Sequence, residues 1–217
     1  TEQATPKRLR DAREEGQVPR SRDLNTLLLL LAASGGLVSF GGHLAGGLTS
    51  QMSSSLSLQR EQIFDPKLLQ PYLGNVLVEV LLTFAPFLLL LFMVAFVAPM
   101  LLGGWVFSPK SLTPKISKMN PIKGFGRIFS MRAPVEAVKA FAKFLVVAVI
   151  SALLLYARDD DLVLLGTEPV KQALGHTAAI IGWSFVALSA VLIVIAAVDV
   201  PFQIWEHAKK LKMTKQQ

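Results

Sequence analysis

Residues 80–107 read VLLTFAPFLLLLFMVAFVAPMLLGGWVF, a run of 28 residues that contains no Lys, Arg, Asp or Glu. About 20 mostly apolar residues in a helix cross the roughly 30 Å hydrocarbon layer of a bilayer. A helix in the core of a soluble protein typically shows an apolar run of only about 10–14 residues. This stretch therefore predicts a membrane-spanning helix.

The composition of the whole chain agrees with a membrane protein. Of its 217 residues, 52% are hydrophobic and only 17% are charged, whereas about a quarter of the residues in a soluble domain are charged. The net charge is +7. A basic chain often binds nucleic acid, but a chain this apolar is expected at a membrane, and we predict no nucleic-acid partner. The absence of cysteine excludes disulfides, cysteine-ligated zinc and thiol catalysis.

Three further apolar stretches bring the number of predicted spans to four. The third is the weakest, because only residues 144–157 are free of charge and its helix must begin near Pro134 to be long enough. Lys139 and Lys143 lie on one face of this helix and can extend to the lipid headgroups. The predicted spans are residues 23–48, 77–107, 134–157 and 177–200.

These spans predict an all-α integral membrane protein built from two helical hairpins. The loop between the hairpins is expected to contain short amphipathic helices. Outside the spans lie the N-terminal segment 1–22, the loops 49–76, 108–133 and 158–176, and the tail 201–217.

The distribution of Lys and Arg predicts the orientation. Residues 1–23 hold six, residues 108–143 eight and residues 206–217 four, so that 18 of the 22 lie on one side. Cytoplasmic segments of membrane proteins are enriched in Lys and Arg. Both termini and the loop 108–133 are therefore predicted to be cytoplasmic.

Capping residues predict where several helices begin. Thr5 and Asp65 each precede a proline, which is favoured at the first helical position, and Ser21 is positioned to cap the first span. Residues 5–15 are predicted to form a charged helix that ends at Gly16.

The loop 108–133 carries the strongest functional signal. Its six Lys and Arg residues are interleaved with apolar residues and accompanied by no acid. Attraction to anionic lipid explains the charge, whereas the apolar residues and helix-starting prolines also favour contact with a protein. Residues 121–130 would form a short basic amphipathic helix suited to either. The residues expected to make this contact are Lys110, Lys115, Lys118, Asn120, Pro121, Lys123, Phe125, Arg127 and Phe129.

Two acids near the ends of spans are candidate functional residues. Glu79 lies near the outer edge of the second span and is expected to be a hydrated carboxylate. Asp199 precedes Pro201, where the fourth helix is predicted to break, so Asp199 is expected to cap a restarted helix. A role for Asp199 in proton transfer or partner contact is the alternative.

Gly42 and Gly46 form a small-xxx-small pattern in the first span. Such residues let two helices approach closely, which predicts packing against the hairpin partner or another subunit. A flexible end of the span is the alternative.

No catalytic or metal-binding constellation is visible in the sequence. His43, His176 and His207 are predicted to lie on different sides of the membrane, which disfavours a shared metal site. The acids at 159–161 are expected to form a solvated turn. We therefore predict no enzymatic activity, no metal and no cofactor.

Three motifs resemble a known family. The first is TEQATPKRLRDAREEGQVPRS at residues 1–21. The second comprises GWVFS at 104–108, KMNPIKG at 118–124 and RIFS at 127–130, and the third is DVPFQIW at 199–205 followed by KKLKMTK at 209–215. In this order the motifs resemble the FlhB/YscU family of type III secretion export-gate proteins. The sequences VPRS and NPIKG are similar to those of flagellar rather than injectisome members.

The resemblance implies a subunit of the flagellar export apparatus in the bacterial inner membrane. Its hairpins would lie around a gate built from FliP, FliQ and FliR, and its loop 108–133 would encircle the gate entrance and help control opening. FlhA, exported flagellar proteins and membrane lipids are further implied partners.

Members of the family also carry a cytoplasmic domain that cleaves itself at Asn-Pro-Thr-His and switches export specificity. That motif is absent from these residues, so we expect the chain to be the membrane portion of a longer protein. The competing hypothesis is a small proton- or ion-coupled transporter that uses Glu79 and Asp199.

Overall fold

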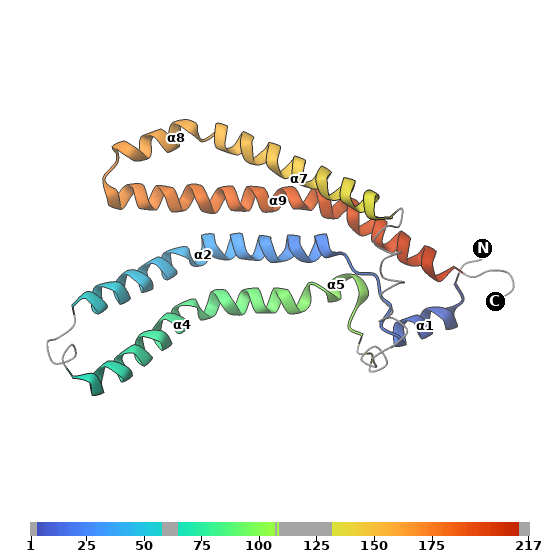
Figure 1. Cartoon of the computed structure of the whole chain (residues 1–217), viewed down its shortest axis with the longest axis horizontal. Coiled ribbons are helices and arrows are strands. Elements are labelled where there is room, and N and C mark those ends of the chain that lie inside the picture. Colours follow the sequence, from blue (N-terminus) through green and yellow to red (C-terminus); the bar gives the residue numbers. More distant parts are fainter. Residues whose placement is uncertain (1–3, 58–64, 107, 109–131, 213–217) are drawn as a thin grey trace.

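The protein is all-helical and is dominated by four long helices (Figure 1). The computed structural model describes residues 4–57, 65–106, 108 and 132–212. All four helices are long and apolar enough to cross a membrane, which confirms the predicted fold class. They are α2 (Arg22–Leu56), α4 (Pro66–Val97), α7 (Arg132–Tyr156) and α9 (Val170–Leu211).

Shorter helices lie beside and between the long ones. Helix α1 (Pro6–Glu14) precedes α2, and α5 (Met100–Gly103) follows α4. Helix α8 (Asp159–Leu164) and the 3₁₀ helix η3 (Leu165–Thr167) connect α7 to α9. The acids at 159–161 are thus the first turn of α8 and not a turn between helices. The amphipathic helix predicted at 121–130 lies outside the described residues.

The long helices form two hairpins, α2 with α4 and α7 with α9, which meet through α2 and α9 (Figure 1). Helices α2 and α9 are antiparallel, because the Ser189 hydroxyl contacts the carbonyl of Leu30 while Gly182 faces Val38. The order across the molecule is therefore α4, α2, α9, α7.

Small residues fill the contact between α2 and α9. Ser34 is completely buried, Ser189 is 2% exposed and Ala196 is 3% exposed. Large apolar side chains such as Phe92 and Leu82 point outward and are 66% and 65% exposed. Lipid tails are as apolar as these side chains, so helix association in a bilayer depends on close backbone approach, which small residues permit.

The residues predicted to cap helices do so at the expected positions. The Thr5 hydroxyl accepts a hydrogen bond from the Arg8 amide at 3.4 Å, and Ser21 and Asp65 cap α2 and α4 in the same way. Gly16 follows α1 with φ of 77°, a left-handed conformation that favours glycine. These short-range predictions are confirmed.

The prediction that α9 breaks at Pro201 is wrong. The helix continues for ten residues beyond it, to Leu211, and α4 likewise contains Pro71 and Pro86 in its interior. A proline removes one backbone hydrogen bond from a helix. Here a side-chain hydrogen bond joins the residues on either side of Pro201, because Gln203 donates to Asp199 at 3.1 Å. By contrast, α4 does stop just before Pro99, where α5 begins.

The helices extend beyond the predicted spans. Helix α2 runs to Leu56 and α4 begins at Pro66, so much of the segment predicted as the loop 49–76 is helical. No proline or glycine interrupts α2 after Gly47, and side chains such as Thr49 add hydrogen bonds to backbone carbonyls one turn back.

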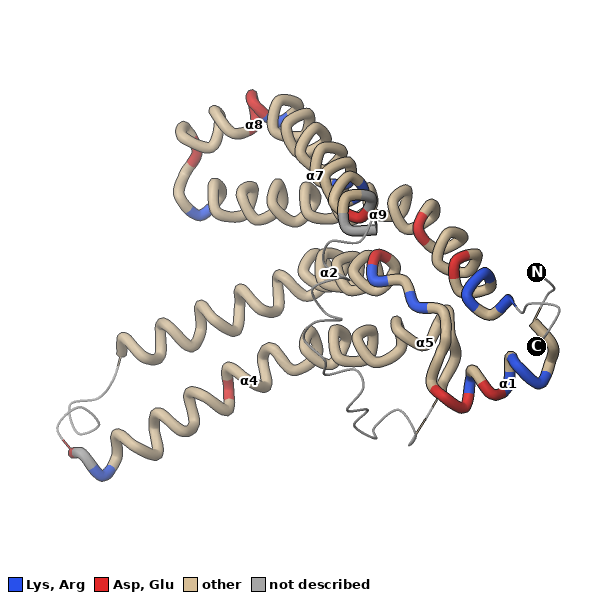
Figure 2. Tube along the Cα trace, turned by 45° about the vertical axis from the view of Figure 1, so that its right-hand side comes forward, with Lys and Arg blue, Asp and Glu red and all other residues tan. Residues whose placement is uncertain are grey.

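Charged residues are concentrated at one end of the described structure (Figure 2). This end is formed by α1, α5, the start of α2 and the last turns of α9, and we call it the junction end. The first described helix, α1, and the end of the last, α9, both lie here (Figure 1). The apolar middles of the long helices carry few charges, of which Glu79 on α4 is one (Figure 2).

Candidate functional site

Polar side chains from three helices meet near the junction end. We call Ser21, Asp23, Lys143, Asp199 and Gln203 the polar cluster. Ser21 lies at its centre and is 2% exposed. Its hydroxyl donates to the Asp199 carboxylate at 2.5 Å and accepts from the Leu24 amide at 3.0 Å. One buried serine thus begins α2 and ties it to α9.

An ion pair attaches α7 to the same cluster. Lys143 of α7 pairs with Asp23 of α2, and their side chains are 38% and 25% exposed. Lys139, one turn earlier, pairs with Glu136 at 3.3 Å and lies 3.9 Å from the centre of the Phe202 ring on α9. Both lysines therefore contact protein groups in addition to any headgroup they can reach.

The cluster satisfies its own polar groups. Asp199 accepts hydrogen bonds from Ser21 and Gln203, and the Asp23 carboxylate is balanced by Lys143. The Ser21 hydroxyl is too buried to reach a substrate, so its contact with a carboxylate is structural. The arrangement can hold the helices together near the junction end.

The alternative role of Asp199 in partner contact or proton transfer stays a prediction, whereas its capping role is wrong. Asp199 lies inside a continuous helix, and the residue that caps is Ser21, which Asp199 contacts. The topology contained a signal for this contact, because residues 21–23, 139–143 and 199 were all predicted at the same edge of the membrane. The pairing itself requires the register between helices, which the sequence does not show.

Helix α1 packs against the other elements of the junction end. Ala12 and Leu211 are 6% and 5% exposed where α1 meets the end of α9. The Ser108 hydroxyl donates to the Glu14 carbonyl at 2.6 Å, which joins the end of α1 to the segment after α5. Val18 packs closely against Gly103 of α5. A Cβ at position 103 would lie 2.8 Å from the Val18 side chain, so the glycine permits this contact.

The structure does not bring Glu79 to the polar cluster. Glu79 is exposed on α4, and its carboxylate has no ion pair or hydrogen bond with the described residues. The nearby Thr83 faces Gly47 of α2, whereas Asp199 contacts Ser21. Gly47 lies 26 positions after Ser21 along α2, which corresponds to about 40 Å at 1.5 Å per residue.

The predicted packing glycines are not the ones that contact a helix of this chain. A Cβ at Gly42 or Gly46 would have nothing within 4 Å, so packing of this pair against the hairpin partner is wrong. The contacts fall instead at Gly36, whose Cβ would lie 2.9 Å from Leu90, and at Gly47. The small-xxx-small spacing therefore indicated a face of α2 that does not contact α4. Packing of Gly42 and Gly46 against another subunit stays a prediction.

The predicted contact residues of the loop, from Lys110 to Phe129, lie outside the described residues. Within the described ranges, no group of three His, Asp or Glu side chains is arranged to hold a metal. His207 is placed at the junction end and His176 pairs with Glu168 at 2.8 Å near η3.

Comparison with known proteins identifies the family. Residues 1–217 match the model of the FlhB, HrpN, YscU and SpaS family. The chain belongs to this family. The resemblance drawn from the three motifs is thereby confirmed, and the chain is a multi-pass member of the FlhB/YscU family.

Several curated proteins are similar along the whole chain. The flagellar biosynthetic protein FlhB of Escherichia coli K12 is 40% identical over 219 residues, which cover 100% of this chain and 56% of that protein. The protein of the same name from Bacillus subtilis is 30% identical, with 100% and 60% covered. The Yop proteins translocation protein U of Yersinia pestis is 29% identical, with 99% and 60% covered. The chain thus spans a little over half the length of these relatives.

Two of the motifs that indicated the FlhB/YscU family meet in the structure. The first motif ends at Ser21 and the third begins at Asp199, and these two residues form the central hydrogen bond of the polar cluster. Because the cluster joins α2 to α9, these motif residues have a structural role in holding the two hairpins together.

Proposed function

We propose that the chain is the membrane portion of a subunit of the flagellar protein export apparatus in the bacterial inner membrane. The match of all 217 residues to the FlhB/YscU family carries this proposal. The greater identity to a flagellar protein of E. coli, 40%, than to the Yop translocation protein, 29%, supports a flagellar rather than an injectisome role.

The subunit associates with a gate of FliP, FliQ and FliR, and works with FlhA and the exported flagellar proteins. Its open apolar surfaces support association within the membrane, since Phe92 of α4 and Phe144 of α7 are 66% and 68% exposed. Surfaces of this kind face lipid or the helices of other subunits. The full-length protein additionally switches export specificity through its C-terminal domain.

Both termini are cytoplasmic in this proposal. The junction end collects the basic residues of α1 and the last turns of α9, which is the distribution expected of the cytoplasmic side (Figure 2). The loop 108–133 connects α5, which belongs to the junction end, to α7, whose Lys143 pairs with Asp23 at the start of α2, and this supports a cytoplasmic position for the loop. The basic and apolar residues of the loop encircle the entrance of the gate.

A proton- or ion-coupled transporter is less well supported. Its two candidate acids would have to act on one pathway, but the contacts of Asp199 and of the region around Glu79 lie about 40 Å apart along α2. Asp199 is also engaged by Ser21 and Gln203.

The loop provides the test of the proposed function. Replacement of Lys115, Lys118, Lys123 and Arg127 by Ser in the full-length protein should strongly reduce secretion of flagellar proteins into the medium. The amount of the protein in the membrane should stay unchanged. A matched variant with Ser at Lys209, Lys210, Lys212 and Lys215 removes the same charge from the tail and should export more than the loop variant.

Normal secretion by the loop variant would contradict the role of the loop. If deletion of the whole protein also left secretion normal, the proposed export function itself would be wrong. Solute flux into liposomes that contain only this protein would favour the transporter instead.

A further inference from the structure

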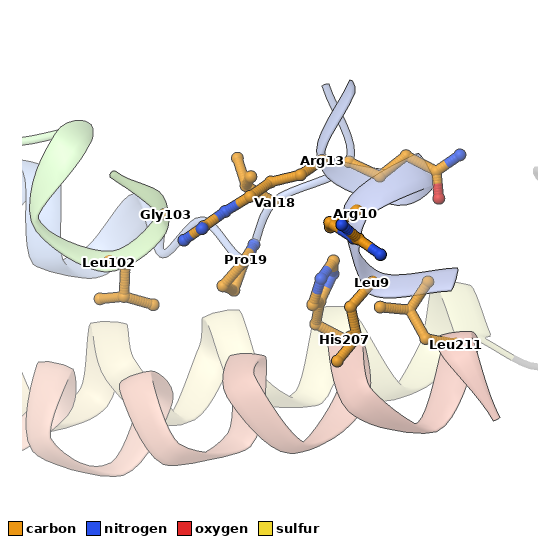
Figure 3. A pocket seen from close by; sticks show the side chains of 10 residues that line it. Leu9, Arg10, Arg13, Val18, Pro19, Leu102, Gly103, His207 and Leu211 are labelled. Atoms are coloured by element: carbon orange, nitrogen blue, oxygen red, sulfur yellow. The ribbon is translucent and has the colours of Figure 1, made fainter. Parts of the chain in front are cut away.

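A pocket of about 360 Å³ lies at the junction end, between α1, α5 and the last turns of α9 (Figure 3). Segments far apart in the sequence form its walls. Arg10 and Arg13 come from α1, Leu102 from α5, and His207 and Leu211 from α9. A pocket built from three regions of the chain exists only when α1 is docked.

The polar part of the pocket is positive. Arg10 and Arg13 line it, and Figure 3 shows the Arg13 side chain extending across the pocket from α1 toward α5. No acidic residue is among its described lining residues, and neither guanidinium has an ion pair or hydrogen bond within the described ranges. Two arginines that pair with no described residue can bind a phosphate, for which their planar forks are well suited.

Two further polar side chains, those of Gln17 and His207, line the pocket, and neither adds positive charge. Partial burial, together with the positive charge of Lys210, lowers the pKa of His207 below its ordinary value. The imidazole is therefore neutral at pH 7, so the two arginines supply the positive charge of the described wall, and its ring can still donate one hydrogen bond.

Most of the other lining residues are apolar. Leu9, Val18, Pro19, Leu102 and Leu211 line the pocket beside the two arginines. Leu102 closes the apolar stretch that begins in α4, and the nearby Trp105 is 70% exposed, as tryptophans at a membrane surface commonly are. A ligand at this level has its polar group beside the arginines and its apolar part beside the leucines.

We propose that this pocket binds the phosphate headgroup of an anionic phospholipid. The inference goes beyond the proposed export function, because it concerns α1 and α9 and does not depend on a gate. A lipid fits better than a free phosphate, since a small hydrated anion gains nothing from five apolar wall residues, whereas a lipid can place its glycerol and upper acyl carbons against them.

The proposal is tested on the full-length protein in detergent, by titration with phosphatidylglycerol and measurement of the midpoint of thermal unfolding. Phosphatidylcholine and inorganic phosphate are titrated in parallel. The variant Arg10→Gln/Arg13→Gln should bind phosphatidylglycerol about tenfold more weakly or worse, because each guanidinium makes charge-assisted hydrogen bonds. The variant Lys7→Gln/Arg8→Gln removes the same charge from α1 outside the pocket and should bind as the parent does.

A second variant tests the apolar wall without changing charge. Leu102→Trp should fill the pocket and weaken binding of phosphatidylglycerol, provided that unfolding without lipid is unchanged. Native mass spectrometry should show phosphatidylglycerol retained by the parent and lost from both pocket variants.

Three results would overturn the proposal. Equal weakening by the two charge variants would mean that α1 attracts anionic lipid without a specific site. Equal stabilisation by inorganic phosphate would identify a simple anion site, and equal stabilisation by phosphatidylcholine would show that the anionic headgroup is not recognised.

Discussion

Helices α4 and α7 are the two outer helices of the molecule, and they are attached to the inner pair α2 and α9 in different ways (Figure 1). Helix α4 approaches α2 closely at several levels, where Gly36 faces Leu90 and Gly47 faces Thr83. Helix α7 reaches the inner pair through charged side chains in its first half, of which Lys143 contacts Asp23.

The difference shows two solutions to one physical problem. A bilayer provides little hydrophobic drive for apolar helices to associate, so contact has to come from close packing or from polar groups. Close backbone approach fixes α4 along its length. A few polar contacts fix α7 in its first half, and its apolar surface stays open, with Phe141 and Leu153 64% and 61% exposed.

Filling the close contact should have the largest effect on stability. In Gly47→Leu, the new Cβ would lie 2.5 Å from Thr83 Cγ2, and a β-branched threonine on a helix has little freedom to move. Overpacking of this kind costs about 1–3 kcal/mol. The free energy of unfolding in detergent, monitored by circular dichroism, should fall by this amount.

The adjacent glycine provides the control for this experiment. Gly46→Leu makes the same change where nothing lies within 4 Å, so the variant should be as stable as the parent or more so. The gain from replacing a glycine inside a helix is at most about 1 kcal/mol. Equal destabilisation by Gly46→Leu would mean that α4 packs on the face of α2 that the small-xxx-small pattern predicted.

The different outcomes for these glycines mark the limit of sequence reasoning in this molecule. Features decided within one or two turns could be predicted, such as the start of α1 at Thr5 and of α2 at Ser21. Three of the four long helices could be predicted from apolar length alone, and the third span from a shorter apolar stretch with a helix start near Pro134. The family, too, followed from contiguous motifs.

Features decided between helices could not be predicted from the sequence. Each span is apolar on nearly all sides, so no polar face indicates which side packs, and both Gly46 and Gly47 are plausible. The contact between Ser21 and Asp199 joins residues 178 positions apart and depends on the register of α2 and α9. The break expected at Pro201 does not occur, because prolines inside membrane-spanning helices are tolerated where surrounding groups stabilise the helix.

Breaking the attachment of α7 should have a smaller effect than filling the contact of α4. Lys143→Met and Asp23→Asn each remove one partner of an ion pair that is partly exposed to solvent or headgroups. A double-mutant cycle should give a coupling of about 0.5–1 kcal/mol, because exposed ion pairs are screened. The stability of each variant is measured from its unfolding midpoint in detergent.

The matched control for this cycle is Glu136→Gln. Its partner Lys139 is on the same helix, so losing that pair does not detach α7, and no change is expected. A coupling between residues 23 and 143 that is no larger than the effect of Glu136→Gln would show that the ion pair does not hold α7.

The smallest effect is expected at the far end of the α2–α4 hairpin. The Tyr72 hydroxyl donates to the Ser55 hydroxyl at 3.1 Å and joins α4 to α2 near the end of α2 that lies away from the junction end. Interhelical hydrogen bonds in membranes average only about 0.6 kcal/mol, so Tyr72→Phe should lower the free energy of unfolding by no more than that. Tyr156→Phe changes a tyrosine that is 83% exposed at the end of α7 and should have no effect. If the two substitutions cost the same, close packing at Gly36 and Gly47 holds α4 without help from polar groups, and the contrast with α7 becomes sharper.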